Sequence, residues 1–173
     1  MSKVISCLIR SFLLVLLLQQ ATMAQHIMID TTLANVGDIP FDSLRDDPGF
    51  KVCHPDIVFQ YYNTPYYYKQ HKKEICSEIL RQYKPARELA GQNGFVTIRF
   101  MINCEGQTGR FRLYCIDENY QPSTFHPALT NQLMEIVKNL KGWQPSLYKG
   151  KTYDTYQYLT FHIQQGNIIT ISP

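Results

Sequence analysis

The sequence predicts an α+β fold, in which helices pack on one face of a small antiparallel sheet. Apolar residues alternate with polar ones along 94–115 and 153–163, which is the period of a β-strand. Apolar residues recur at three- and four-residue spacing along 71–84 and 129–140, which is the period of a helix. The order helix, strand, strand, helix, strand favours a two-layer architecture. A chain of 173 residues suffices for one domain.

Residues 1–24 have the layout of a secretory signal peptide. Lys3 and Arg10 precede an apolar run, and small residues precede Gln25, so we expect cleavage after Ala24. The alternative is a retained inner-membrane anchor facing the periplasm, although the apolar run is shorter than the roughly 20 residues of a spanning helix. We therefore expect a periplasmic or secreted protein.

Cleavage lowers the formal charge from +3 to +1, because the leader carries two basic residues and no acidic ones. Nucleic-acid binding depends on neutralising many phosphates with basic side chains. The nearly neutral remainder therefore argues against a nucleic-acid partner.

Residues 25–70 are expected to form an irregular N-terminal segment that contains Tyr and Cys, ahead of a domain over 71–173. Asp, Pro and Gly are scattered along 25–50 without a sustained period. The stretch VFQYYNTPYYYKQH, at 58–71, has two interpretations: an aromatic platform for sugars or a membrane interface, or a short strand and turn packed on the core. We favour the second, because no period places all the rings on one face.

Two amphipathic helices are expected. The first spans His71–Lys84 and ends at Pro85. The second begins near Pro127, a residue suited to the first helical turn, and ends at Gly142. Their apolar stripes are Ile75, Cys76, Ile79, Leu80 and Tyr83 in the first helix, and Leu129, Leu133, Ile136, Val137 and Leu140 in the second.

A β-hairpin is expected over Gly94–Cys115. Even-numbered residues are apolar in its first strand and odd-numbered residues in its second. The two apolar sets therefore share a face only in registers in which the numbers of paired residues add up to an odd number. A two-residue Glu105–Gly106 turn gives such a register. It pairs Cys104 with Gln107, Phe100 with Phe111, Ile98 with Leu113 and Val96 with Cys115.

Four cysteines remain after Cys7 leaves with the leader, an even number in a chain bound for an oxidising compartment. In the expected register Cys104 and Cys115 lie about 27 Å apart, whereas a disulfide tolerates about 4.4–6.8 Å between Cα atoms. They cannot bond to each other, which leaves two connectivities. We favour Cys53 with Cys104 and Cys76 with Cys115, because the helix that carries Cys76 leads into the strand beside Cys115.

Patterns typical of catalysis are missing from the sequence. The five histidines are dispersed, and there is no GxSxG, no phosphate loop and no pair of carboxylates on one face. His126 stands at a helix start and His162 on a strand, without an evident carboxylate partner or nucleophile. The cysteines form no CxxC and match no common zinc spacing. We therefore expect no enzyme activity, no catalytic residues, no cofactor and no metal.

The order of elements over residues 80–173, together with particular residues, resembles the C-terminal domain of TonB, in a secreted variant typical of Bacteroidetes-type bacteria. The matching residues are Gly94–Phe100, Asn103–Gly106, Pro127–Leu129, Trp143–Pro145, Gly150 and Leu159–Ile163. TonB couples inner-membrane energy to outer-membrane transporters. This chain departs from TonB in having no long Pro- and Lys-rich linker, so the resemblance leaves energy transduction an open question.

The resemblance implies a site for a short extended peptide, such as a segment of a TonB-dependent outer-membrane transporter, that adds as a strand beside the closing strand. Membrane contact would then occur only through the partner, and a second copy of the chain is another partner for the same edge. The residues of this peptide-binding edge would be Tyr153, Tyr156, Tyr158, Thr160 and His162.

Two alternatives stay open. The last strand, Asn167–Ile171, would cover this edge if it pairs there, as sheets commonly protect their edges. The other class of function is a small secreted enzyme or redox protein with an unrecognised site.

Overall fold

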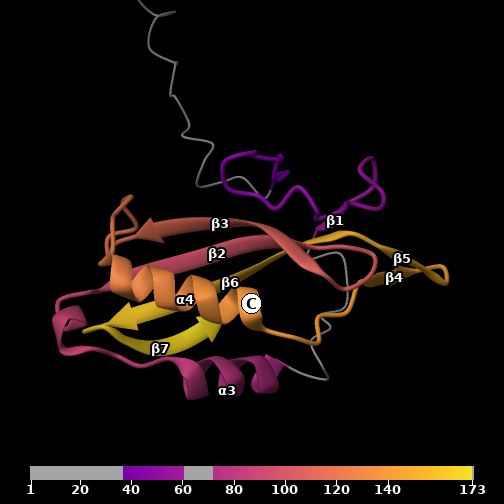
Figure 1. The fold of residues 1–173 in the computed structure, drawn as a ribbon. Helices are drawn as coiled ribbons and strands as arrows, with labels where there is room; N and C mark the ends of the chain where they lie inside the picture. Colours follow the sequence, from indigo (N-terminus) through magenta and orange to yellow (C-terminus); the bar gives the residue numbers. More distant parts are fainter. Residues whose placement is uncertain (1–36, 61–71, 173) are drawn as a thin grey trace, which may run out of the picture. The chain divides into compact units, whose positions relative to one another are not determined.

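The computed structural model describes residues 37–60 and 72–172, and its fold is of the α+β class, as the sequence predicts (Figure 1). The predicted leader, 1–24, and the Tyr-rich stretch 61–71 lie outside the described residues. The elements are β1 (Phe59–Gln60), α3 (Lys72–Gln82), the 3-10 helix η2 (Arg87–Leu89), β2 (Gly94–Ile102), β3 (Thr108–Ile116), α4 (Pro127–Asn139), β4 (Ser146–Tyr148), β5 (Lys151–Tyr153), β6 (Thr155–Gln164) and β7 (Asn167–Ser172).

Five strands form one sheet in the order β1-β6-β2-β3, with β7 also paired to β6, while β4 and β5 form a separate hairpin. The pairs β2–β3, β2–β6 and β6–β7 are antiparallel, as expected. The pair β1–β6 is parallel, so the sheet is mixed rather than purely antiparallel. β1 belongs to the N-terminal segment, for which the sequence suggests a short strand but gives neither its partner nor its direction.

The β2–β3 hairpin has the predicted register in the half that lies away from its connecting loop. Val96 lies opposite Cys115, and Ile98 lies opposite Leu113. Near the tip the register differs, because the loop has three residues, 104–106, rather than two. The Asn103 amide donates to the Gln107 carbonyl over 2.8 Å. The predicted pairing of Cys104 with Gln107 is therefore wrong.

Backbone conformation explains the longer loop and the return to the predicted register beyond it. Gly106 has φ +78°, so a type I turn followed by a left-handed residue closes the loop. A β-bulge then restores the register: Met101 pairs with Gly109 whereas Arg99 pairs with Arg112. Arg110 in the bulge has φ +53°, and its guanidinium donates to the Ile39 carbonyl over 3.0 Å.

Both helices contribute to one core on a single face of the sheet, and α4 runs across that face in front of β2 and β6 (Figure 1). The inward residues of β2 and β6 are fully buried, as the alternating pattern predicts. The buried core residues from these strands and helices include Val96, Ile98, Phe100, Leu159, Phe161, Ile163, Ile75, Ile79, Leu129, Leu133 and Val137.

The N-terminal segment 37–58 covers the opposite face of the sheet and has no helix or strand of its own. Ile39, which is 2% exposed, packs with Met101 of β2 and Tyr156 of β6 in a second, smaller core. Phe50, Val52 and Val58 pack around these three residues. Residues from 37 onward therefore belong to the same compact unit as the sheet.

We predict that Ile39→Ala lowers the free energy of unfolding by about 2–5 kcal/mol, because it leaves a cavity against Met101 and Tyr156. Leu44→Ala is the matched control in the same segment, since Leu44 is 94% exposed. Urea unfolding followed by circular dichroism measures both. Equal effects of the two substitutions would show that the segment does not pack on the sheet.

Candidate functional site

The residues of the predicted peptide-binding edge do not share one open edge. Tyr153 lies in β5, where its ring packs 4.9 Å from His54 and 5.3 Å from Phe59 between centroids. The other four lie on β6. Tyr156 is 5% exposed and belongs to the second core. Tyr158 is partly exposed and pairs with Arg99 of β2.

Thr160 and His162 lie in the interior of the sheet. Thr160 pairs with Thr97 of β2 on one side and with Ser172 of β7 on the other. The Thr97 and Thr160 hydroxyls are hydrogen-bonded over 2.9 Å. The His162 ring stacks on Phe95 with centroids 4.7 Å apart.

Strand β6 has partner strands on both of its sides, although none within the described residues pairs with the outer side of 157–159. β2 pairs with its whole inner side, from Thr155 to Ile163. On the other side β7 pairs with Thr160–Gln164, and β1 pairs with Thr155 and Tyr156. The alternative expectation, that the last strand covers this edge, is confirmed for Thr160–Gln164. A peptide cannot therefore add along the whole length of β6.

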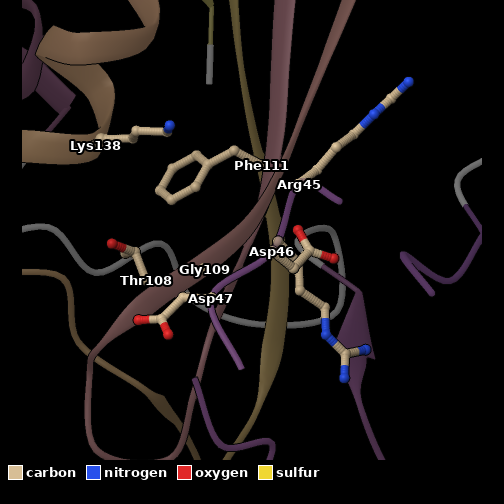
Figure 2. Close-up of a pocket in the computed structure, with 8 residues that line it drawn as sticks. Arg45, Asp46, Asp47, Thr108, Gly109, Phe111 and Lys138 are labelled. Carbon is tan, nitrogen blue, oxygen red and sulfur yellow. The ribbon is translucent and has the colours of Figure 1, made fainter. Parts of the chain in front are cut away.

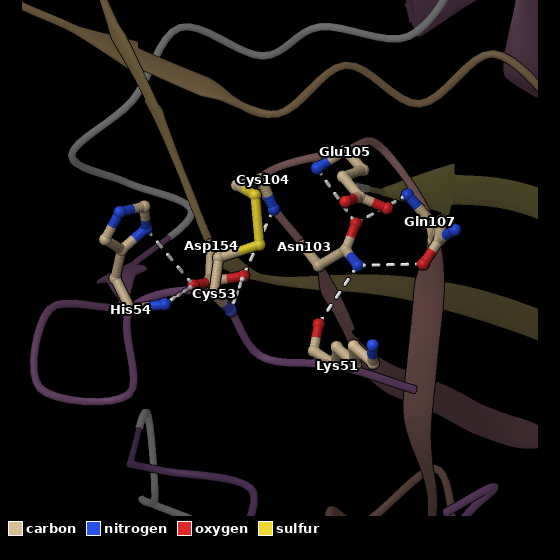
Figure 3. The surroundings of a disulfide bond; sticks show 8 residues. All are labelled: Lys51, Cys53, His54, Asn103, Cys104, Glu105, Gln107 and Asp154. Carbon is tan, nitrogen blue, oxygen red and sulfur yellow. Dashed lines mark hydrogen bonds and ion pairs between the residues drawn. A yellow bond between two sulfur atoms is a disulfide. The ribbon is translucent and has the colours of Figure 1, made fainter. Parts of the chain in front are cut away.

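A buried carboxylate at the start of β6 holds three segments together (Figure 3). Asp154 is 0% exposed, and its carboxylate accepts hydrogen bonds from the amides of Cys53 at 3.1 Å, His54 at 2.6 Å and Cys104 at 3.1 Å. Its backbone carbonyl accepts from the Phe59 amide over 2.9 Å. Burial of a carboxylate is tolerated when its oxygens are hydrogen-bonded in this way.

The disulfide beside Asp154 joins Cys53 to Cys104, as predicted, with 6.0 Å between the Cα atoms. It spans a sequence separation of 51 residues. In the chain-entropy model, closing a loop of this length stabilises the folded state by about 4 kcal/mol. The disulfide and Asp154 therefore fix the N-terminal segment to the hairpin tip at the same point.

The second predicted bridge, Cys76–Cys115, is not formed, because Cys115 is a free thiol. Burial raises the pKa of the Cys115 thiol to about 11. The prediction assumed that the helix that carries Cys76 lies beside Cys115, because it leads into the neighbouring strand, but α3 lies nearer the opposite edge of the sheet. Tyr83, just after α3, donates to the Gly166 carbonyl at the β6–β7 turn over 2.6 Å, whereas Cys115 lies on β3 at the other edge.

The outer side of β3 is a second edge, and part of it is open. At its end, the Ser123 amide donates to the Cys115 carbonyl over 3.0 Å, and Ile116 bridges to Pro122. Along 108–114, no strand within 37–60 or 72–172 pairs with the outer side. Backbone groups alternate in direction along a strand, so Leu113, two residues before Cys115, also directs its amide and carbonyl outward.

A groove of about 290 Å³ lies beside residues 108–111 of this edge (Figure 2). Lys138 of α4 reaches from one wall, with its ammonium 5.9 Å from the centroid of the Phe111 ring. The residues that line the groove are Arg45, Asp46 and Asp47 of the N-terminal segment, Thr108, Gly109, Arg110 and Phe111 of β3, and Lys138. The edge of β3 thus lies between the N-terminal segment and α4.

An ion pair holds the N-terminal wall of the groove against β3. The Arg112 guanidinium donates to both carboxylate oxygens of Asp46 at 2.7 Å, and the Asp46 side chain is 1% exposed. These hydrogen bonds from Arg112 lower the pKa of Asp46 below its usual value. Arg112 also donates to the Pro40 carbonyl over 2.7 Å. The carboxylate of Asp46 is therefore neutralised within the protein.

Comparison with known proteins gives no relative: no family model, curated protein or solved structure matches the chain. Within residues 37–60 and 72–172, no three His, Cys, Asp or Glu side chains form a group that could hold a metal ion. The same residues include no helix long and apolar enough to cross a membrane. The site must therefore be interpreted from its geometry.

Sequence reasoning missed the groove and the Asp154 cluster. The groove residues come from three segments, 45–47, 108–111 and 138, whose proximity no local pattern reveals. Asp154 did carry a signal, because it is the one acidic residue inside the otherwise strand-like stretch 153–163.

We predict that Asp154→Asn lowers the free energy of unfolding by about 2–4 kcal/mol, because an amide nitrogen would face backbone N–H donors that the carboxylate satisfies. The exposed Asp56, in the same segment, provides the control Asp56→Asn, which should leave stability nearly unchanged. Urea unfolding of the oxidised protein measures both. A loss no larger than that of Asp56→Asn would contradict the role assigned to Asp154.

Proposed function

We propose that this protein is a non-enzymatic interaction module of the bacterial periplasm or cell envelope that binds an extended peptide by strand addition. The observation that carries the proposal is the edge of β3 along 108–114, which is unpaired in the described part of the chain and has a groove beside its residues 108–111. In strand addition, backbone hydrogen bonds provide affinity, and pockets beside the strand select side chains. In this proposal the open edge of β3 offers the backbone hydrogen bonds, and the groove offers a pocket for a side chain of the peptide.

The backbone around Leu113 is the point of pairing in this proposal. The Leu113 side chain is 40% exposed, and its amide and carbonyl point away from β2. The neighbouring outward carbonyl, that of Phe111, accepts from the Arg112 guanidinium over 2.9 Å. A partner strand would therefore pair at Leu113 and place a side chain in the groove between Lys138 and Asp47.

The class of partner comes from the resemblance to the TonB C-terminal domain. We propose that the chain belongs to a secreted, TonB-like group and that its partner is a periplasmic segment of an outer-membrane transporter or another envelope protein. The leader-like residues 1–24 and the Cys53–Cys104 disulfide support an oxidising compartment outside the cytoplasm. Because β1 and β7 pair with most of the outer side of β6, the proposed edge is β3 and not the strand that the family pattern indicates.

A redox function receives no support from the free thiol of Cys115. A redox-active cysteine needs a thiolate near neutral pH. Burial raises the pKa of Cys115 to about 11, which keeps it protonated. Peptide binding is therefore the function that we propose.

The proposal predicts that peptides from the N-terminal periplasmic segments of the source bacterium's outer-membrane transporters shift the NMR signals of residues 108–114. Leu113→Pro removes the outward N–H at a position where an edge strand tolerates proline. It should weaken binding about tenfold, the equivalent of one backbone hydrogen bond. The control Leu113→Val keeps the N–H and should bind like the wild type.

The titration also separates the two edges without any substitution. Shifts confined to β7, at Asn167–Ser172, would place the partner on the other side of the sheet and contradict the proposed edge. The absence of shifts anywhere in the protein at millimolar peptide would reject transporter segments as the ligand.

A further inference from the structure

The β4–β5 hairpin is a separate two-stranded ribbon that extends beyond the main sheet (Figure 1). Leu147 pairs with Thr152, and Tyr148 pairs with Lys151. Lys149 and Gly150 form the turn with φ values of +47° and +77°, which is the conformation of a tight type I′ hairpin. The tip of the ribbon is therefore a defined structure.

The tip of this hairpin combines exposed apolar side chains with exposed lysines. Leu147 is 62% exposed and Tyr148 is 50% exposed. Lys149 and Lys151, on either side of the turn glycine, are exposed as well. The ribbon 146–153 contains no acidic residue. The next residue, Asp154, is buried and hydrogen-bonded to backbone amides, so it does not offset these charges at the surface.

Aromatic contacts hold Tyr148 in place while half of it remains exposed. Its ring centroid lies 5.7 Å from that of Phe59 and 6.5 Å from that of Tyr153. The Lys149 ammonium lies 5.3 Å from the centroid of the Tyr148 ring. Leu147 lies on the opposite face of the ribbon, because successive side chains of a strand alternate. The tip therefore presents apolar surface on both faces, with positive charge beside it.

We propose that the β4–β5 tip contacts the surface of a bilayer that contains anionic phospholipid. Lysines are attracted to anionic headgroups, tyrosine is suited to the headgroup level, and leucine gains from contact with acyl chains. Charge complementarity favours an anionic bilayer over a neutral glycan as the occupant of this surface. The proposal goes beyond the proposed function, because it concerns a different surface from the β3 groove and a direct contact rather than one through a partner.

The expected contact is reversible. Each lysine near an anionic surface strengthens binding about fivefold, so two lysines account for a factor of about 25. Two apolar side chains add a contribution that is far from the irreversible insertion of a spanning helix. Such a contact would concentrate the protein at a membrane without anchoring it.

The test uses protein recovered from the periplasm of cells that express the full chain, so that any processing of the leader has taken place. It is sedimented with vesicles of phosphatidylcholine containing phosphatidylglycerol and with vesicles of phosphatidylcholine alone. The wild type should sediment with the anionic vesicles and should be released by salt. Lys149→Gln with Lys151→Gln should weaken binding at least about tenfold. Adding Leu147→Asn to these two substitutions should weaken binding further.

Matched controls change the same residue types elsewhere. Lys73→Gln with Lys141→Gln removes two other exposed lysines, and Leu44→Asn replaces another exposed leucine. Both should bind vesicles like the wild type. Equal sedimentation with the two kinds of vesicle, or equal losses in the control and hairpin variants, would overturn the proposal. Binding of the wild type to neither kind would overturn it too.

Peptide titration of the hairpin variants distinguishes this proposal from the proposed function. Variants that lose vesicle binding but keep the peptide-induced shifts along β3 support two separate surfaces. Loss of the β3 shifts in these variants would overturn the separation, because it would make the hairpin part of the peptide site.

Discussion

The buried carboxylate of Asp154 is the interaction on which the arrangement of this protein depends. It accepts amide hydrogen bonds from Cys53 and His54 of the N-terminal segment and from Cys104 at the hairpin tip. The disulfide closes the same junction covalently. With residues 53–54 fixed there, the segment before them lies across the second face of the sheet, and β1 after them pairs with β6. The result is a sheet in which β6 lies between β2 and the strands β1 and β7, and β3 is an outer strand.

Much of the fold could be predicted from the sequence, because strand and helix periods record which residues face the core. Alternation predicted the pairing of Val96 with Cys115, and the separation of Cys104 from Cys115 excluded a bridge between them. Of the two connectivities that remained, the favoured one contained the Cys53–Cys104 bridge, which the structure confirms. The helix's own pattern shows which of its faces is buried but not which edge of the sheet α3 lies near, and this led to the incorrect Cys76–Cys115 bridge. The three-residue loop escaped prediction because the bulge at Arg110 restores the same register further along the hairpin.

The candidate site could not be predicted in the same way. The N-terminal wall of the groove is held by contacts between side chains and backbone, such as those of Arg112 with Asp46 and Pro40, and these leave no period in the sequence. The resemblance to the TonB C-terminal domain directed attention to β6, but the additional strand β7 pairs with it. The proposed edge follows from sheet topology, which depends on pairings between residues distant in the chain. A peptide edge at β3 and a lipid contact at the β4–β5 tip would suit a protein that works close to a membrane.

Amide hydrogen exchange measured by NMR on the oxidised protein tests whether β6 is an interior strand and the outer side of β3 is open. The account predicts slow exchange at every amide from Thr160 to Ile163, because β2 and β7 pair with both sides of this stretch. Along β3 it predicts alternation, with fast exchange at Leu113 and slow exchange at Arg112 and Tyr114, whose amides face β2. Alternating exchange along 160–163 together with slow exchange at Leu113 would contradict the account.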